Sequence, residues 1–390
     1  MKQIGSKRGH EKSGVGFADI KTALRDDILT GRLQPGQRLP VLTNLASRFN
    51  TNHVTLLRAV HALVNDGYLR TEKRVGIYVA KNPPHLSQYA MIFPFKAEDL
   101  TSQFLIGLRN EAAKRQSAEM RVSLFYNIEE HVDVEDYQQL VSFVKAHRVA
   151  GLIFTEPLFK LQGTPLIDEP GIPRVVNAYG PFLSGIPAVG VDIHGFMPRA
   201  LRYLRQQGRR KAAAIIINDL RDPVALTEHY AREAAAAGLE LLPHNVVSIS
   251  ALTPRWARIA IQTLFRRPDH ERPDALIITD DNLVPDATAG LLEMGLRAPQ
   301  DLEIVAHTNF PWPTPSHVPV TRLGYDLSQM LDLFIERIDQ QRRGETAPPR
   351  TLLPPIFESE MSPKRTSETT VRQEGFATVG EPRLAHRRIP

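Results

Sequence analysis

The feature that most constrains the fold is an alternation of strand-like and helix-like segments between residues 87 and 358. Short apolar runs typical of strands occupy residues 89–93, 122–125, 151–154, 174–177, 212–217, 275–279 and 302–306. Helical periodicity lies between them, at residues 102–114, 134–147, 196–207 and 254–265. This α/β alternation predicts parallel sheets covered by helices on both faces. The length of the region favours two such lobes with a cleft between them over one very wide sheet.

Residues 16–81 follow a different pattern, in which short helices precede a hairpin. Helices are expected at residues 17–30, 41–49 and 52–65, and strands at residues 68–70 and 76–80. Ile20, Leu24 and Ile28 recur every four positions and form the apolar face of the first helix. Asn52 is well suited to cap the third helix, which follows the second after a three-residue break. The segment therefore predicts a winged helix-turn-helix.

Positive charge is concentrated in the same part of the chain. Residues 1–86 carry 14 Lys and Arg against 6 Asp and Glu, whereas the whole chain has a net charge of only +5. A basic head on a mildly acidic body is typical of a module that binds nucleic-acid phosphates, joined to a domain that does not. Double-stranded DNA is therefore the expected macromolecular partner.

The helix-turn-helix pattern also nominates residues for DNA binding, because the second helix of the motif enters the major groove through its amino-terminal residues. Contacts with base edges are expected from Asn52, His53, Val54 and Leu57. Contacts with phosphates, or with the minor groove from the wing, are expected from Arg38, Thr55, Arg58, Lys73 and Arg74. Taken alone, His53 would more often be an ordinary surface histidine and Arg74 a solvated turn residue. Their common placement on one predicted face, together with the charge excess, favours contact with DNA. Two half-sites on a palindromic operator predict a homodimer.

Ligands of open α/β folds bind beyond the carboxyl ends of the strands. The candidates for effector binding at those ends are Phe95, Asn177, Tyr179, Asp192, Arg221, Asp222, Asp280, Asp281 and Asn309. Carboxylates and amides bind hydroxyl groups, and an aromatic ring stacks on a sugar face, so a sugar or polyol is the expected effector. A second interpretation stays open, in which Asp280 and Asp281 only cap the next helix and Asp192 lies in a turn.

Residues 17–81 resemble the GntR-type winged-helix regulators. The resemblance rests on Gly31, Leu33-Gln34-Pro35-Gly36, Leu39-Pro40, Leu45-Ala46, Phe49, Thr55, Ala59, Leu63, Gly67 and Gly76, which have that family's order and spacing. The departures are Val41 and Thr43 where serine and arginine are usual, His53 where arginine is usual, and Arg74 at a usual wing glycine. The resemblance implies the mode of DNA binding and leaves the operator sequence open.

Residues 86–358 are similar, more loosely, to the effector domains of LacI/GalR-type repressors, which themselves resemble periplasmic sugar-binding proteins. The similarity rests on residues 148–153, 172–176, 189–192, 273–281 and 318–321. It implies a periplasmic-binding-protein-like sensor with Asp192 and Asp280 at the ligand, and a transcription repressor that the ligand controls. Thr308 stands where those repressors often have an aspartate.

The remaining segments define the expected boundaries: a disordered leader at residues 1–15, a polar linker at 82–86, the sensor at 87–358 and a disordered tail at 359–390. The chain has no cysteine, so thiolate sites and disulfides are excluded. No apolar run is long enough to span a membrane, and a cytoplasmic location is expected. Cofactor and catalytic motifs are missing, so neither a cofactor nor enzyme activity is expected.

Two alternatives remain at this stage. The first is a winged helix fused to an aminotransferase-like domain with pyridoxal phosphate, for which Lys211 is the only lysine between residues 161 and 363. The second is a solute-binding protein with an unrelated basic extension.

Overall fold

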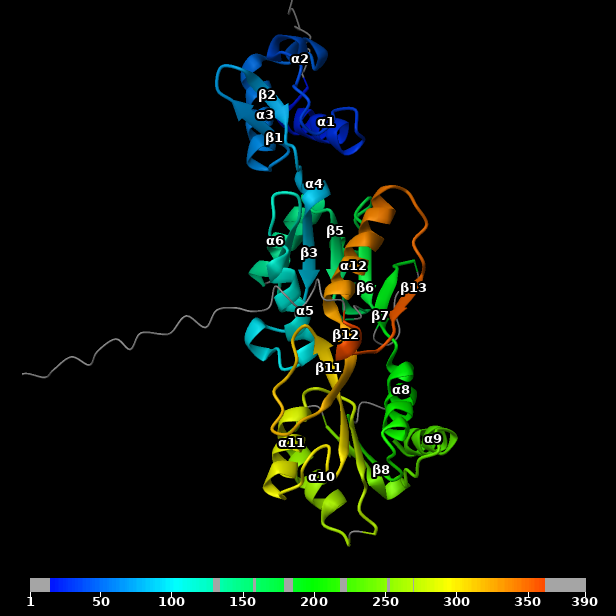
Figure 1. Ribbon diagram of the computed structural model, residues 1–390. Helices are drawn as coiled ribbons and strands as arrows, with labels where there is room; N and C mark the ends of the chain where they lie inside the picture. The colour runs from blue at the N-terminus through cyan, green and yellow to red at the C-terminus, as the bar shows by residue number, and fades with distance from the viewer. Residues whose placement is uncertain are drawn as a thin grey trace, which may run out of the picture.

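The computed structural model describes residues 15–128, 134–156, 159–178, 185–217, 223–250, 253–268 and 270–361. Most of the leader expected at residues 1–15 and of the tail expected at 359–390 lies outside these residues. The described chain forms three bodies in a row, a head, a first lobe and a second lobe, with the head at one end (Figure 1). The predicted architecture is confirmed.

The head contains the predicted helices and hairpin. Its elements are α1 (Phe17–Leu29), α2 (Leu42–Arg48), α3 (His53–Asn65), β1 (Leu69–Glu72) and β2 (Gly76–Val79), the strands being antiparallel. Ile20, Leu24 and Ile28 are buried against α3, as their spacing predicted. The buried carboxylate of Asp27 accepts hydrogen bonds from Arg32 at 2.6 Å and Arg48 at 2.8 Å. Asp27 thereby ties α1 to α2, because a buried carboxylate is stable only when it is paired.

The segment predicted as a polar linker is shorter and more structured than expected. Residues 84–87 form one helical turn, α4 (Pro84–Ser87), directly before the first strand of the first lobe. The hydroxyl of Ser87 donates to the carbonyl oxygens of Asn82 and Pro83 at 3.2 and 3.1 Å, which closes this turn. Residues 84–86 of the predicted polar linker at 82–86 therefore belong to a helical turn.

The first lobe is built on a six-stranded parallel sheet in the order β13-β7-β6-β5-β3-β4. Its strands are β3 (Gln88–Ile92), β4 (Arg121–Phe125), β5 (Gly151–Phe154), β6 (Arg174–Asn177), β7 (Ala188–Val191) and β13 (Arg350–Leu353). Its helices are α5 (Gln103–Lys114), α6 (Glu135–Lys145), α7 (Pro165–Asp168) and α12 (Leu327–Arg342), with short turns η1 (Ala97–Asp99) and η3 (Phe159–Leu161). One core lies between the sheet and α5 and α12, and another beneath α6 and α7.

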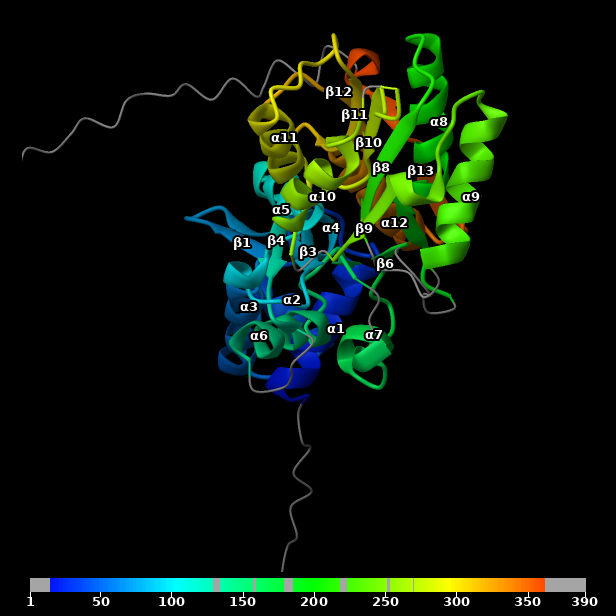
Figure 2. The ribbon, with the colours of Figure 1, turned by 90° about the horizontal axis from the view of Figure 1, so that it is seen from below.

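The second lobe has a six-stranded sheet in the order β14-β12-β11-β10-β8-β9, parallel except at the β12–β14 pair. Its strands are β8 (Ala212–Ile217), β9 (Val246–Ile249), β10 (Ala275–Ile278), β11 (Glu303–Phe310), β12 (Thr321–Asp326) and β14 (Ile356–Phe357). Its helical elements are α8 (Ile193–Gln206), α9 (Pro223–Ala236), η4 (Pro243–Asn245), α10 (Trp256–Phe265) and α11 (Val284–Glu293). Helices α8 and α9 cover one face of the sheet, and α10 and α11 cover the other (Figure 2).

Within the described residues, the chain passes between the lobes three times. It leaves the first lobe after β7, returns after β12 and leaves again after β13. The hydroxyl of Tyr325 donates to the carbonyl oxygen of Asp192 at 2.9 Å, and the Asp192 amide donates to Leu353 at 2.8 Å, so the three passages are bonded together. Because β7 and β12 end at these passages, the carboxyl ends of both sheets face the boundary between the lobes.

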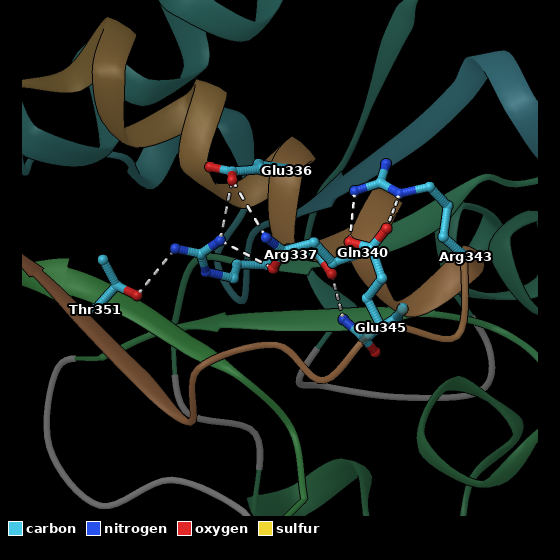
Figure 3. Close-up of polar contacts among 7 residues, drawn as sticks. Glu336, Arg337, Gln340, Arg343, Glu345 and Thr351 are labelled. Atoms are coloured by element: carbon cyan, nitrogen blue, oxygen red, sulfur yellow. Dashed lines mark hydrogen bonds and ion pairs between the residues drawn. The ribbon is translucent and has the colours of Figure 1, made fainter.

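Helix α12 belongs to the first lobe although it follows the second lobe in sequence. Its apolar residues Leu327, Leu331 and Phe334 are fully buried in the first-lobe core. Near its carboxyl end, Arg337 donates to Gln340 at 2.9 Å and to Thr351 of β13 at 3.3 Å (Figure 3). The bond to Thr351 fixes β13, the edge strand of the first-lobe sheet, to α12.

The first residues of the tail predicted from residue 359 are described by the structure. Residues 358–360 form the turn η5 (Glu358–Glu360), and the carboxylate of Glu360 pairs with Arg199 of α8. The same guanidinium donates to the carbonyl oxygen of Pro355 at 2.6 Å. The chain is therefore held against α8 up to this point, because one arginine binds two successive parts of the segment.

Candidate functional site

The amino terminus of α3, the second helix of the helix-turn-helix, is exposed. Asn52, His53 and Val54 are all exposed there, and the Val54 side chain, at 68 % exposure, is apolar and unpartnered by the head's core. The side-chain oxygen of Asn52 accepts a hydrogen bond from the Thr55 amide at 2.8 Å, which caps the helix. Asn52 therefore has a structural function whether or not it contacts a base.

The tip of the wing carries exposed positive charge. Lys73 and Arg74 are exposed at its tip, and Arg74 has a φ of 63°, in the left-handed region that glycine adopts most easily. Arg38 donates from its guanidinium to the Val75 carbonyl oxygen, and a Cβ on Gly76 would lie only 2.8 Å from its Nε. Arg38 therefore stabilises the wing through this hydrogen bond, and the missing side chain of Gly76 leaves room for the Arg38 guanidinium.

The other residues predicted to contact DNA differ in accessibility. Arg58 is exposed, with its guanidinium 5.4 Å from the centre of the Phe17 ring. Thr55 and Leu57 are half-buried. Seven of the nine residues predicted to contact DNA are therefore exposed in the structure, and two are half-buried.

In the second lobe, the predicted residues Asp280, Asp281 and Asn309 lie together at the carboxyl ends of β10 and β11. The Asn309 amide donates to the Asp281 carboxylate at 2.7 Å, and both side chains are almost fully buried. Asp280 accepts bonds from the backbone and side-chain nitrogens of Asn282 at 2.9 and 2.7 Å. Neither aspartate caps the following helix α11, whose N-cap is Leu283 without a side-chain cap bond, so the helix-capping interpretation is wrong.

His307 is a member of this cluster that the sequence interpretation missed. Its Nδ1 lies 3.6 Å from a carboxylate oxygen of Asp281, too far for a hydrogen bond but close enough for an ion pair. Its ring lies between those of Phe196 and Tyr325, with centroids 5.6 and 5.5 Å away. His307 comes directly after the predicted strand at residues 302–306, so its position was the signal that could have identified it.

The charges of the cluster depend on one another. Burial raises the pKa of the Asp280 carboxyl above its usual range, and the nearby His307 only partly offsets this effect. Burial lowers the pKa of His307, but the Asp281 and Asp280 carboxylates raise it by more. The pKa of His307 therefore lies above its usual value. Within the described residues, His307 Nδ1 and Asn309 Oδ1 are buried without a hydrogen-bond partner. The cluster thus contains two buried polar atoms whose hydrogen-bonding capacity is not used within the described protein.

On the first lobe, the predicted effector residues are more dispersed. Phe95 is 48 % exposed, whereas Asn177 is buried and donates to the Thr155 carbonyl oxygen at 3.0 Å. Asp192 caps α8 by accepting from the Gly195 amide at 3.0 Å, in agreement with its interpretation as a turn residue. Tyr179, Arg221 and Asp222 lie outside the described residues.

Direct contacts join the lobes beside the cluster. The Gln103 amide donates to the side-chain oxygen of Asn282 at 3.2 Å. The Trp312 indole donates to the buried carboxylate of Glu111 at 3.0 Å, and the Lys114 ammonium lies 4.3 Å from the centre of the indole ring. These contacts place the second-lobe cluster against α5 of the first lobe.

Two pockets of the described surface lie away from this boundary. One of about 630 Å³ is on the first lobe and includes Asp168, Arg174 and Gln341, and one of about 310 Å³ lies beside α10 and β9. No group of three or more His, Asp or Glu residues in the described ranges is placed to hold a metal ion. Among the helices that the structure describes, none has the length and apolar character needed to cross a membrane.

The cap on α3 gives a prediction about stability. Asn52→Ala should speed native-state hydrogen exchange in peptides covering residues 53–65, because losing an N-cap costs about 1 kcal/mol. Asn52→Asp keeps an acceptor at the cap and is the matched control. An alanine variant with the parent's exchange rates would show that the cap does not stabilise the helix.

Comparison with known proteins supports the division into head and lobes. Residues 18–79 match the family model of bacterial regulatory proteins of the gntR family, and residues 201–358 match that of a periplasmic binding protein-like domain. The arabinose metabolism transcriptional repressor of Halalkalibacterium halodurans is 21 % identical over 92 % of this chain and 98 % of its own. The transcriptional repressor PurR of Erwinia tasmaniensis is 25 % identical over 72 % of this chain and 86 % of its own.

Solved structures share the fold of the two lobes. The chain resembles a LacI family transcriptional regulator of Bifidobacterium animalis with a TM-score of 0.52 and 14 % identity, over 71 % of this chain and 96 % of the other. Its likeness to the transcription regulator CcpA of Lactococcus lactis has a TM-score of 0.50 and 18 % identity, over 70 and 97 % of the two chains. The second domain is thus of the periplasmic-binding type, which sets aside the aminotransferase-like alternative. The chain therefore joins a domain that matches the gntR family model to a domain that matches the periplasmic binding protein-like model and shares its fold with LacI family regulators.

Proposed function

We propose that the chain is a transcription repressor that binds operator DNA through its head and is released by a small molecule bound between its lobes. The observation that carries the proposal is the exposure of the amino terminus of α3 together with that of the basic wing tip at Lys73 and Arg74. An exposed helix end of this kind fits the major groove, and the wing then reaches the flanking phosphates or minor groove. Catalytic activity is not part of the proposed function. The proposed location is the cytoplasm, where chromosomal DNA is accessible.

Within the head, the proposal separates residues that read bases from residues that bind phosphates. His53 and Val54 project from the first turn of α3 and would contact base edges and a thymine methyl group. Lys73, Arg74 and Arg58 would contact phosphates, since they are exposed and positively charged. Arg38 acts mainly by holding the wing in place.

The wing is tested by changing its charge without changing its backbone. Lys73→Ala combined with Arg74→Gly removes two cations and keeps a residue suited to the positive φ at position 74. Binding to all duplexes should weaken, and the slope of log K against log salt should become shallower by about 2, because each phosphate contact contributes about 0.9. Fluorescence anisotropy over a salt series measures both quantities.

The same titrations test the proposed homodimer, because saturation is expected at two chains per palindromic duplex. His53→Ala is the contrasting variant, and it should alter base preference while leaving the salt slope unchanged. A double variant that binds with the parent's affinity and salt slope would contradict the assignment of the wing.

A sugar or related polyol is the proposed effector. Asp280 and His307, which are half-buried, and the buried Asn309 present carboxylate, imidazole and amide groups at the carboxyl ends of β10 and β11, at the boundary between the lobes. Such groups bind the paired hydroxyls of a sugar through several directed hydrogen bonds. The arabinose metabolism repressors among the relatives support this ligand class, and pentoses are therefore the first candidates.

A thermal-shift screen over pentoses, hexoses, polyols and nucleosides tests the ligand class. A ligand present at 100 times its dissociation constant should add about 2.7 kcal/mol to the free energy of unfolding and raise Tm. Asp280→Asn should abolish the shift, whereas Asp301→Asn, which changes an aspartate outside the cluster, should keep it. If sugars and polyols leave Tm unchanged while another class raises it, the sugar proposal is wrong.

A further inference from the structure

The head is hydrogen-bonded to the first lobe through Tyr68, in addition to being joined to it by the chain. This residue follows α3 and is completely buried. Its hydroxyl lies 3.1 Å from the carbonyl oxygen of Ala146 and 2.5 Å from that of His147, and donates to this pair. Burial raises the pKa of the Tyr68 hydroxyl, so it stays protonated and remains a donor.

The two carbonyl groups are available because they lie at the carboxyl end of α6. The His147 amide donates to Val144 at 2.9 Å and the Arg148 amide to Phe143 at 2.8 Å, while His147 has a φ of 54°. This termination satisfies the carbonyls of the preceding turn and leaves those of Ala146 and His147 without an intrahelical donor. They form the negative end of the helix, where a hydroxyl donor from another domain is stabilising.

Further contacts surround this bond and restrict the head. The ring of Tyr68 stacks on His85 of α4 at 5.7 Å, and Arg342 of α12 donates to the His85 carbonyl oxygen at 3.1 Å. Arg148, at the end of α6, lies 3.7 Å from the carboxylate of Asp66 in the head. The contact region between head and first lobe therefore contains residues of the head, of the helical turn α4, of the carboxyl end of α6 and of α12.

The opposite end of α6 lies at the carboxyl ends of the first-lobe strands. The Asp136 carboxylate, in the first turn of α6, accepts from the Tyr126 amide just beyond β4 at 2.7 Å. The Tyr126 ring stacks on Phe93 at 5.2 Å, and the Asn127 amide donates to the Phe95 carbonyl oxygen at 2.8 Å. One helix of 11 residues therefore connects the strand ends that face the second lobe with the carbonyl groups that hold the head.

We infer that Tyr68 is a positioning residue that fixes the orientation of the head on the first lobe, and that α6 transmits displacements of the strand ends to it. The inference rests on the proposed function for its regulatory meaning, because a fixed head makes the spacing of two half-sites depend on the geometry of the sensor. The contact itself exists without DNA or effector and can be tested without either.

The test measures a distance between the head and the first lobe in the free protein. The chain has no cysteine, so spin labels on Ser47→Cys in α2 and Ala113→Cys in α5, both exposed positions, form one defined pair. Double electron–electron resonance, with labelled chains diluted in unlabelled protein, should give one narrow distance distribution. Tyr68→Phe keeps the buried ring, loses the hydroxyl and should at least double the width of that distribution.

Two further variants make the result decisive. Tyr78→Phe removes a hydroxyl from the wing, where the Tyr78 ring packs under Arg70, and should leave the narrow distribution unchanged. Arg148→Gln alters the contact region from the first-lobe side, leaves the head intact and should also broaden the distribution. A broad distribution in the parent protein, or narrow ones in both Tyr68→Phe and Arg148→Gln, would overturn the inference. DNA binding does not enter these measurements, so their outcome is independent of the proposed function.

Discussion

The structure depends on one topological constraint, which is that the parallel strands of both lobes end at the boundary between them. The chain passes between the lobes beside these strand ends, and the passages are bonded through Asp192, Tyr325 and Leu353. Relative movement of the lobes must therefore occur around this bonded group. A ligand bound at the boundary can shift the lobes only by as much as it prefers one arrangement over the other.

The same constraint explains why buried polar groups are concentrated where elements from distant parts of the chain meet. Glu111 binds Trp312 across the boundary, and Asp281 binds Asn309 between two strand ends. In the head, Asp27 is held by two arginines that come from outside its helix. Each buried group is costly without its partner, so these pairs specify how the elements are arranged as well as stabilising them.

Much of the fold could be predicted from the sequence, because local patterns are strong in the head and in the central strands. The spacing of Ile20, Leu24 and Ile28 marked α1, and the apolar run at residues 212–217 coincides with β8. The edge strands β13, in the first-lobe sheet, and β14, in the second-lobe sheet, could not be predicted. Both are short, and each pairs with a strand that is not adjacent to it in sequence. The place of α12 depends on contacts such as that of Tyr89 with Asp339, which are 250 positions apart.

The candidate sites were predictable to different degrees. Exposure of His53, Lys73 and Arg74 follows from local helix and hairpin geometry, so the sequence was sufficient to locate that face. The second-lobe cluster requires β10 and β11 to be neighbours, which brings His307 to Asp281 and could not be inferred from either segment alone. Asn177 was nominated by its position after a strand, but its amide is used within the first lobe.

The central claim is that occupancy of the boundary between the lobes controls the affinity of the head for DNA. Its most direct test is the dissociation constant of the full chain for a selected operator duplex, measured at fixed salt with and without the sugar that raises Tm. The account predicts that the sugar increases this constant at least about fivefold, the lower end of common allosteric couplings. Equal constants in the presence and absence of a saturating sugar would contradict it.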